Sequence, residues 1–318
     1  MRDYVVRRVA LALPTMFLVA VVVFITMRML PGDAALIQVV QSQSQDQATF
    51  YQAVRHQMGL DRPIYVQFAD WSWRLLRYGD LGKSYGAQDS VTHQILSHLP
   101  VTVELAAGSI VLGVALSIPW GVVAAIQHDR VGDYVPRVVS VLLLSVPNFW
   151  VATLLVVLPA IWFRYMPAPG YVSFFDHPFA NLQQFFLPCL AVGSRLIGTT
   201  LRMTRSSMLE VLHQDYVRTA WAKGLREHTV VYRHALKNAL IPVITLVGAQ
   251  VAFLLGGAVI VESVFGLPGL GNLTLQAIYQ RDYPQIQGNV LLIALAVVVV
   301  NLVTDLCYGW LDPRIQYR

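Results

Sequence analysis

The sequence predicts an all-α integral membrane protein that crosses the bilayer about six times. Of its 318 residues, 56% are hydrophobic and only 13% are charged, whereas a soluble domain carries about 25% charged residues. The charges are clustered, and they leave long uncharged stretches between them. Several of these stretches reach the roughly 20 apolar residues that a membrane-spanning helix needs.

Six runs with few or no charges are the expected spans. They cover residues 9–27, 105–128, 138–163, 185–201, 239–261 and 288–304, the last continuing to residue 310. The first run is too long for the apolar region of a signal peptide, which has about 7–15 residues, and is interpreted as a membrane anchor. The fourth run is the weakest, because Pro188 and Arg195 interrupt it.

The distribution of positive charge predicts the orientation. An even number of spans places both termini on one side, and 14 of the 23 Lys/Arg residues then fall on that side. Cytoplasmic loops of membrane proteins carry an excess of Lys and Arg. We therefore expect both termini to be cytoplasmic.

This topology predicts the organisation of the chain. We expect an N-terminal transmembrane helix over 1–30, an extracytoplasmic segment over 31–98, a five-helix core over 99–311 with a cytoplasmic loop over 202–238, and a cytoplasmic tail over 312–318. The extracytoplasmic segment contains aromatic patches that suit the headgroup level of the membrane.

No catalytic or metal-binding pattern is visible in the sequence. Residues 79–84 read GDLGKS, like the end of a phosphate-binding loop, but Arg77 stands where that motif requires its first glycine. Cys189 and Cys307 lie far apart in apolar runs and show no ligand spacing. Nucleic-acid-binding motifs are also missing. We expect no enzyme activity, no metal, no cofactor and no nucleic acid partner for this chain.

The loop 202–238 is the most informative segment, with seven Lys/Arg residues against three acids. Asp215 is a suitable N-cap, and Lys223 stands where a cation favours the last turn of a helix. Gly224 can adopt the left-handed conformation that stops a helix. These signals predict a short helix that is terminated at both ends.

One face of this short helix is apolar, because Val217, Ala220 and Trp221 follow i, i+3, i+4 spacing. Such a helix suits insertion into a groove on a partner protein. The positive charge of the loop equally suits the surface of an anionic membrane. Physical chemistry alone leaves both interpretations open.

Short motifs along the chain are similar to those of one known family. In the loop they are RMTRSSMLEVL (202–212), DYVRTA (215–220), AKGL (222–225) and RHALKNALIP (233–242). Elsewhere they are LPGD (30–33), GLDRP (59–63), FGLPGLG (265–271) and LDPR (311–314). Together they resemble the permease subunits of ATP-binding-cassette (ABC) importers for dipeptides, oligopeptides and nickel. The resemblance covers essentially the whole chain.

The loop departs from the general ABC-permease pattern, which reads EAA, three residues and then glycine. Arg218, Thr219 and Ala220 stand where EAA would be, and Gly224 lies at the matching distance. The replacement of the acid by arginine looks like the peptide and nickel branch of the family.

The resemblance implies a type I ABC importer permease fold and a coupling helix that docks on an ATPase subunit. The coupling residues would be Asp215, Val217, Arg218, Thr219, Ala220, Trp221, Lys223, Gly224 and Leu225. It also implies four other subunits in the inner membrane system of a prokaryote: a second homologous permease, two ATP-binding subunits that carry ATP and Mg, and an extracytoplasmic substrate-binding protein. Membrane lipid would surround the spans.

The resemblance leaves the substrate open between a dipeptide, an oligopeptide, nickel and another metal chelate. The motifs PNFW (147–150) and DYPQIQ (282–287) and the short connector between the third and fourth spans look closest to the nickel and metal-chelate members, and peptide members share much of this pattern. No acidic or histidine cage is visible among the spans, so a chelate or a peptide fits better than a free ion.

Polar residues in or near the spans are candidates for the transport path or for helix contacts. They are Arg195, Gln250, Glu262, Asn289, Asn301 and Asp305. A charge at the bilayer centre costs about 2.5–3.5 kcal/mol on insertion scales, so each charged residue is expected to face protein or water. The amides suit helix–helix contacts.

Two other classes of protein agree less well with the sequence. A secondary transporter predicts inverted repeats with paired broken helices, but only one expected span is broken and the basic loop would lack an explanation. An intramembrane enzyme needs a nucleophile–base pair or a metal motif in the spans, and neither is visible.

Overall fold

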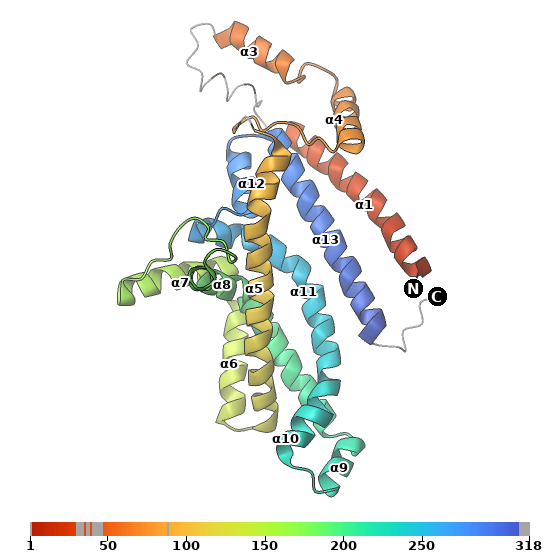
Figure 1. Cartoon of the computed structure of the whole chain (residues 1–318), viewed down its shortest axis with the longest axis vertical. Coiled ribbons are helices and arrows are strands. Elements are labelled where there is room, and N and C mark those ends of the chain that lie inside the picture. The colour runs from red at the N-terminus through yellow and green to blue at the C-terminus, as the bar shows by residue number, and fades with distance from the viewer. Residues whose placement is uncertain (1, 30–34, 36–38, 40–46, 88, 312–318) are drawn as a thin grey trace. The chain divides into compact units, whose positions relative to one another are not determined.

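The computed structural model describes residues 2–29, 35, 39, 47–87 and 89–311, and the side chains of all of these except 2–9, 252, 255 and 305–311. In this part of the chain the regular structure is helical, as the sequence predicts. The helices are α1 (Arg2–Met29), α3 (Gln47–Gln57), α4 (Ile64–Tyr78), α5 (Val91–Ile126), α6 (Val131–Ser145), α7 (Asn148–Phe163), α8 (Pro178–Leu212), α9 (Asp215–Ala222), α10 (Glu227–Thr229), the π-helix η1 (Val230–Ala235), α11 (Leu236–Phe265), α12 (Leu270–Tyr279) and α13 (Tyr283–Leu311) (Figure 1).

The described helices provide four to six segments that are long and apolar enough to cross a membrane. Four are single helical stretches: Ala10–Met29, Val91–Ile126, Glu227–Val251 and Tyr283–Thr304. Two more are bent pairs, Val131–Ser145 with Asn148–Phe163 and Gly256–Phe265 with Leu270–Tyr279, if each pair counts as one span. The prediction of about six spans is confirmed at the upper count, but the expected fourth run, 185–201, is not among these segments, and the bent pair 256–279 was not expected as a span.

The run 138–163, expected as one span, is divided into two helices. α6 ends at Ser145, and α7 starts at Asn148 in a direction turned by 108°. Val146 is extended, with ψ 129°, because the ring of Pro147 disfavours a helical conformation in the residue before it. The hydropathy of the sequence misses this bend because both halves are apolar.

The expected fourth span, 185–201, is part of a longer helix. α8 continues through Pro188 and packs against α6, α7 and α11. Small polar side chains of α8, including Ser194, Thr200 and Thr204, are completely buried. A helix that packs against protein on several sides can carry polar residues that a lipid-facing helix cannot.

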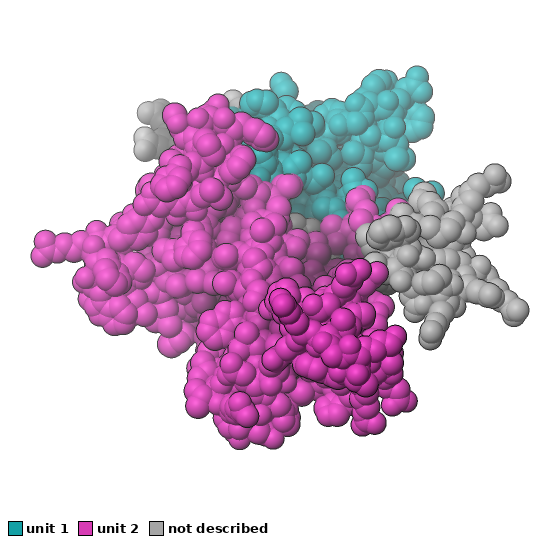
Figure 2. All heavy atoms as spheres, turned by 60° about the horizontal axis from the view of Figure 1, so that its bottom comes forward, with its two compact units in different colours: residues 1–100, 269–298, 317–318 teal, residues 101–268, 299–316 magenta. Residues whose placement is uncertain are grey.

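Contacts divide the chain into two compact units (Figure 2). Unit 1 comprises residues 1–100, 269–298 and 317–318, and unit 2 comprises 101–268 and 299–316. The expected boundaries near residues 30, 98 and 311 remain predictions.

Glycines of α5 allow α8 to approach closely within unit 2. A Cβ atom at Gly113 would lie 2.8 Å from the Leu196 side chain, and one at Gly121 would lie 2.6 Å from Cβ of Thr204. Small residues let two helix backbones come together and gain dispersion contacts, which drive helix association in a membrane.

Two apolar clusters hold unit 1 together. Phe24 of α1 and Trp71 of α4 pack with Leu291 of α13 in the first cluster. Val91 of α5 packs with Leu270 of α12 in the second. These clusters bring the N-terminal helices to the segment 269–298, which is distant in sequence.

Candidate functional site

The short helix expected in the loop 202–238 is present as α9 (Asp215–Ala222), which lies with α10 at one end of unit 2 (Figure 1). Its start differs from the prediction, because Gln214 and not Asp215 is the N-cap residue. The carbonyl oxygen of Gln214 accepts hydrogen bonds from the amides of Val217 and Arg218 at 3.0 and 3.1 Å. Asp215 lies in the first turn, where its carboxylate still favours the helix dipole.

The end of α9 forms as the sequence predicts. Gly224 is left-handed, with φ +71°. Its amide donates to the carbonyl oxygen of Trp221 at 2.9 Å, and the amide of Leu225 donates to the carbonyl oxygen of Ala220 at 3.4 Å. This pair of bonds is a Schellman motif, which satisfies the last carbonyl groups of a helix.

The apolar face of α9 is divided between the interior and the surface. Val217 and Ala220 are buried against Val230, so these two side chains fix the helix to its own chain. Trp221 is 45% exposed. Val217 and Ala220 therefore do not offer the outward face that their spacing with Trp221 suggested.

The surface that α9 and the three residues after it present combines polar side chains with Trp221, Ala222 and Leu225, and contains one position without a side chain, Gly224. Its exposed residues are Asp215, Tyr216, Arg218, Thr219, Trp221, Ala222, Lys223, Gly224 and Leu225. Arg218 lies 3.7 Å from the carboxylate of Asp215, and both side chains are well exposed, so this ion pair contributes little. No atom lies within 4 Å of the place that a Cβ of Gly224 would occupy.

Tyr216 fixes α9 to the start of α11, a role that no pattern in the sequence indicates. Its hydroxyl accepts a hydrogen bond from Asn238 Nδ2 at 2.7 Å and points its own proton to the carbonyl oxygen of His234 at 3.5 Å. Residues 230–235, between the two helices, form a π-helical turn. Such turns are rare and are frequent at functional sites.

A buried ion pair joins the first turn of α6 to α8. Arg205 donates from Nε to Asp133 Oδ1 at 2.5 Å and from Nη2 to Oδ2 at 2.7 Å. Asp133 is fully buried and the Arg205 side chain is 17% exposed. Bidentate pairs of this kind are strong and directional. The pair therefore fixes the start of α6 to α8.

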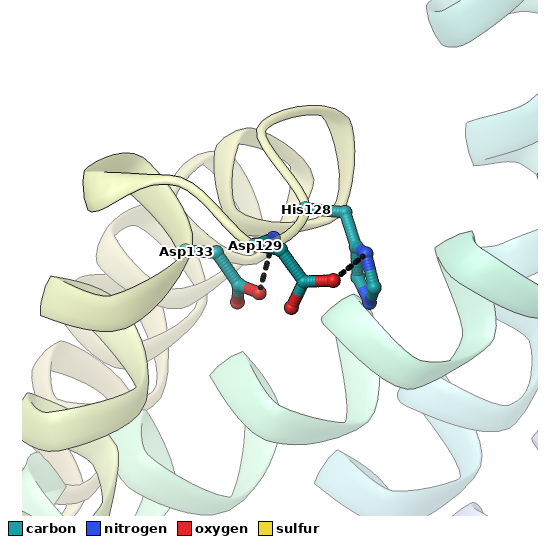
Figure 3. Close-up of side chains that lie close together, drawn as sticks. All are labelled: His128, Asp129 and Asp133. Atoms are coloured by element: carbon teal, nitrogen blue, oxygen red, sulfur yellow. Dashed lines mark hydrogen bonds and ion pairs between the residues drawn. The ribbon is translucent and has the colours of Figure 1, made fainter.

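His128, Asp129 and Asp133 come close enough together to resemble a metal site (Figure 3). His128 Nδ1 lies 3.0 Å from the carboxylate of Asp129, and the amide of Asp129 donates to Asp133 Oδ2 at 3.1 Å. Both oxygens of Asp133 are bound by Arg205, whose charge would repel a cation. The cluster is an ion-pair network that orders the loop.

Two of the expected polar residues of the spans come together between α8 and α11. Gln250 donates to Thr199 Oγ1 at 2.5 Å, and Thr199 Oγ1 donates to the carbonyl oxygen of Arg195 at 3.0 Å. The Arg195 side chain is exposed and makes no ion pair with the residues that the structure describes. Arg195, Thr199 and Gln250 therefore form a short polar strip, in which Thr199 bonds to the main chain of Arg195 and not to its side chain.

The other expected polar residues are separate. Glu262 is fully buried and accepts a hydrogen bond from Thr102 Oγ1 at 2.6 Å. Asn289 is buried in unit 1, where it donates to Thr274 Oγ1 at 3.0 Å. Asn301 is exposed, and the side chain of Asp305 lies outside the described residues. Glu262 and Asn289 therefore stabilise helix contacts.

The chain matches two family profiles that together cover most of its length. Residues 117–317 match the binding-protein-dependent transport system inner membrane component. Residues 1–106 match the N-terminal part of the membrane component of binding-protein-dependent transport systems.

Curated relatives match over whole chains. A putative peptide transport system permease protein of Brucella abortus is 39% identical over 317 residues and covers 100% of both chains. A di/tripeptide transport system permease protein of Pseudomonas aeruginosa is 35% identical, again over 100% of both chains. A glutathione transport system permease protein of Escherichia coli K12 is 37% identical over 318 residues, with the same coverage.

Solved structures of ABC transporters share the fold. The MetNI methionine ABC transporter in an inward-facing conformation matches with a TM-score of 0.54 at 15% identity, covering 69% of this chain and 96% of that one. An amino acid ABC transporter matches with a TM-score of 0.50 at 16% identity, covering 70% and 95%.

Proposed function

The chain belongs to the family of binding-protein-dependent transport system inner membrane components, and we propose that it forms half of the path by which an ATP-driven importer moves a small peptide into the cell. As a permease subunit it has ATPase subunits as partners. In the proposed complex there are two of these, with a second homologous permease and an extracytoplasmic binding protein. ATP and Mg belong to the ATPase subunits.

The exposed end of α9 is the observation that supports coupling to an ATPase. α9 is held to its own chain by buried Val217 and Ala220 and by the Tyr216–Asn238 hydrogen bond. This rigid attachment leaves Trp221 and the backbone at Gly224 exposed. A helix that is fixed on one side and exposed on the other can transmit a displacement of the partner to α8 and α11. A helix that merely rested on lipid would not need this attachment.

The strip that contains Arg195, Thr199 and Gln250 is the proposed contribution to the transport path. An arginine exposed in the middle of a span would cost about 2.5–3.5 kcal/mol or more against hydrocarbon. Facing a second permease or the water-filled space between two permeases removes that cost. Asn301 and Asp305 are further candidates for this path.

A cytoplasmic location of α9 and of both chain termini is part of the proposal. The loop that contains α9 and the loop that contains Arg130 and Arg137 both carry the positive charges typical of cytoplasmic segments. Asp133, in the first turn of α6, pairs with Arg205 of α8, which is consistent with a common side for these two charged regions.

A peptide is the proposed substrate, and the names of the relatives support it. The Pseudomonas relative is a di/tripeptide permease and the Escherichia relative a glutathione permease. A nickel chelate is the second candidate from the sequence. The one His/Asp group that resembles a metal site among the described residues has its buried carboxylate bound by Arg205, so it does not favour a metal ion as cargo.

Transport by the reconstituted complex tests this proposal. We expect proteoliposomes that contain both permeases, the ATPase subunits and the binding protein to accumulate a labelled di- or tripeptide only when ATP and Mg are supplied to the ATPase side. This chain alone should show no ATP hydrolysis. Accumulation that is driven by an ion gradient without ATPase subunits would contradict the proposed function. Accumulation of a nickel chelate in place of a peptide would contradict the proposal that the substrate is a peptide.

A further inference from the structure

Unit 1 contains a pocket of about 1130 Å³. Its walls come from the end of α1, from α3, α4, the loop 79–90 and the first turns of α13, all within this one unit. Pockets that hold small ligands have volumes of about 300–1000 Å³. The space is therefore sufficient for a peptide of two or three residues.

Two buried hydrogen-bond donors line the pocket without a partner among the described residues. They are Nε1 of Trp71 and Nε2 of Gln287. Trp71 is 8% exposed and Gln287 is 3% exposed, so water reaches neither side chain freely. A buried donor without an acceptor destabilises a fold, and these two groups are available to acceptors on a ligand.

The loop that closes one side of the pocket is held from within. Asp282, which is 1% exposed, accepts hydrogen bonds from Ser84 Oγ at 2.5 Å and from the amide of Gly86 at 3.0 Å. The intervening Tyr85 lines the pocket, and burial raises its pKa to about 12. Its hydroxyl therefore stays protonated at physiological pH. A wall that is fixed before the ligand arrives reduces the entropy cost of binding.

The charged side chains around the pocket favour an anion. Four are cationic and two acidic: Arg28, Arg62, Arg74, Lys83, Asp70 and Asp80. Arg62 and Asp70 pair with each other at 3.1 Å. Asp80 accepts a hydrogen bond from the amide of Gly82 at 2.9 Å and keeps its charge, so the lining has two more cations than acids. The cations that remain can form charge-assisted hydrogen bonds with an oxyanion.

We propose that this pocket binds a short peptide through its terminal carboxylate, as an entry site for the substrate. This inference rests on the proposed peptide transport. Arg74 and Lys83 provide the positive field for the carboxylate. Trp71 and Gln287 donate to the carboxylate or to peptide carbonyl oxygens, and exposed Trp73 offers an aromatic surface to the peptide side chains.

Saturation-transfer NMR on the permease–ATPase complex in phosphatidylcholine nanodiscs, without the binding protein, tests the site. The probes are alanyl-alanine and its C-terminal amide. We expect alanyl-alanine to bind and the amide to bind about tenfold more weakly, because the amide lacks the charge-assisted bonds. Gln287→Leu and Arg74→Ala should each weaken alanyl-alanine binding by about fivefold to tenfold.

Matched variants separate binding from folding. Gln287 Nε2 has no partner among the described residues, so Gln287→Leu removes no known hydrogen bond of that nitrogen from the fold. Arg77 lies on the same helix as Arg74, is exposed and does not line the pocket; its guanidinium lies 5.7 Å from the centroid of the Trp73 ring, and it is not one of the cations, Arg74 and Lys83, whose positive field the test addresses. Arg77→Ala should therefore bind alanyl-alanine like the native protein.

The outcomes distinguish this inference from the function on which it rests. Equal binding of alanyl-alanine by the native, Gln287→Leu and Arg74→Ala proteins would overturn the site. So would displacement of alanyl-alanine from the native protein by phosphatidylglycerol in the nanodisc, because the pocket would then hold a lipid headgroup. ATP-dependent peptide uptake without any binding here would remove the site but leave the transport function. Absence of uptake would reject the function itself.

Discussion

The left-handed residue that ends α9 gives a specific prediction for coupling. Gly224 has φ +71° and its missing Cβ would meet no atom within 4 Å. In this chain alone, the effect of a side chain there is therefore conformational and not steric. A non-glycine residue in the left-handed region costs about 1–2 kcal/mol, which corresponds to a factor of about 5–30 in the population of the native helix end.

Replacing Gly224 by Val and by Asn separates conformation from contact. Valine is β-branched and strongly disfavours the left-handed region, whereas asparagine tolerates it. We expect Gly224→Val to lower ATP-dependent peptide uptake by about fivefold or more while ATP hydrolysis continues. Gly224→Asn should retain most uptake if only the backbone conformation matters.

Uptake and ATP hydrolysis measured together in proteoliposomes provide the assay, with equal incorporation of each variant as the control. If Gly224→Asn fails as badly as Gly224→Val, the partner contacts the glycine backbone directly. Native uptake by Gly224→Val would refute the reasoning, because the end of α9 would then have no part in coupling.

Three further predictions concern stability and attachment. Asp133→Ala leaves Arg205 without its buried partner and should destabilise the protein by about 3–5 kcal/mol, measured as a lower melting temperature in detergent. Exchanging both residues for leucine should recover part of this loss. An unchanged melting temperature in the single variant would contradict a stabilising role of the ion pair. Tyr216→Phe should lower the free energy that holds α9 to α11 by about 0.5–1.5 kcal/mol, measured as faster amide hydrogen exchange in residues 215–222. Exchange at the native rate would show that the hydroxyl does not hold the helix. Gly121→Ala should destabilise the protein by about 1–3 kcal/mol through overpacking. Gly256→Ala, with no atom within 4 Å of its added carbon, should leave the melting temperature unchanged. Equal melting temperatures of the two variants would contradict the close approach of α5 and α8.

Local signals in the sequence predicted local structure. Gly224 indicated the end of α9 because the left-handed stop depends on that residue and its neighbours alone. The uncharged runs indicated the apolar helices, since hydropathy and length are properties of each segment. The bend at Pro147 was missed, because its apolar flanks 138–145 and 148–163 read as one continuous run.

Features that depend on contacts between residues distant in the chain could not be predicted from the sequence. Asp133 and Arg205 are 72 positions apart, and their pairing follows from the packing of α6 on α8. Val217 was expected on an outward face, but Val230, across the turn that follows α9, covers it. The exposure of Arg195 likewise depends on which helices surround α8.

Cross-linking from α9 tests the central claim most directly. With a lysine-to-cysteine change at Lys223, a short bifunctional reagent should join this chain to an ATPase subunit in the purified complex, and the yield should change when ATP is added. A cysteine at His93, in unit 1, should give no such product. If the chain purifies without an ATPase subunit and the cysteine at position 223 reacts only with lipid or with nothing, the account of α9 as the coupling element is wrong.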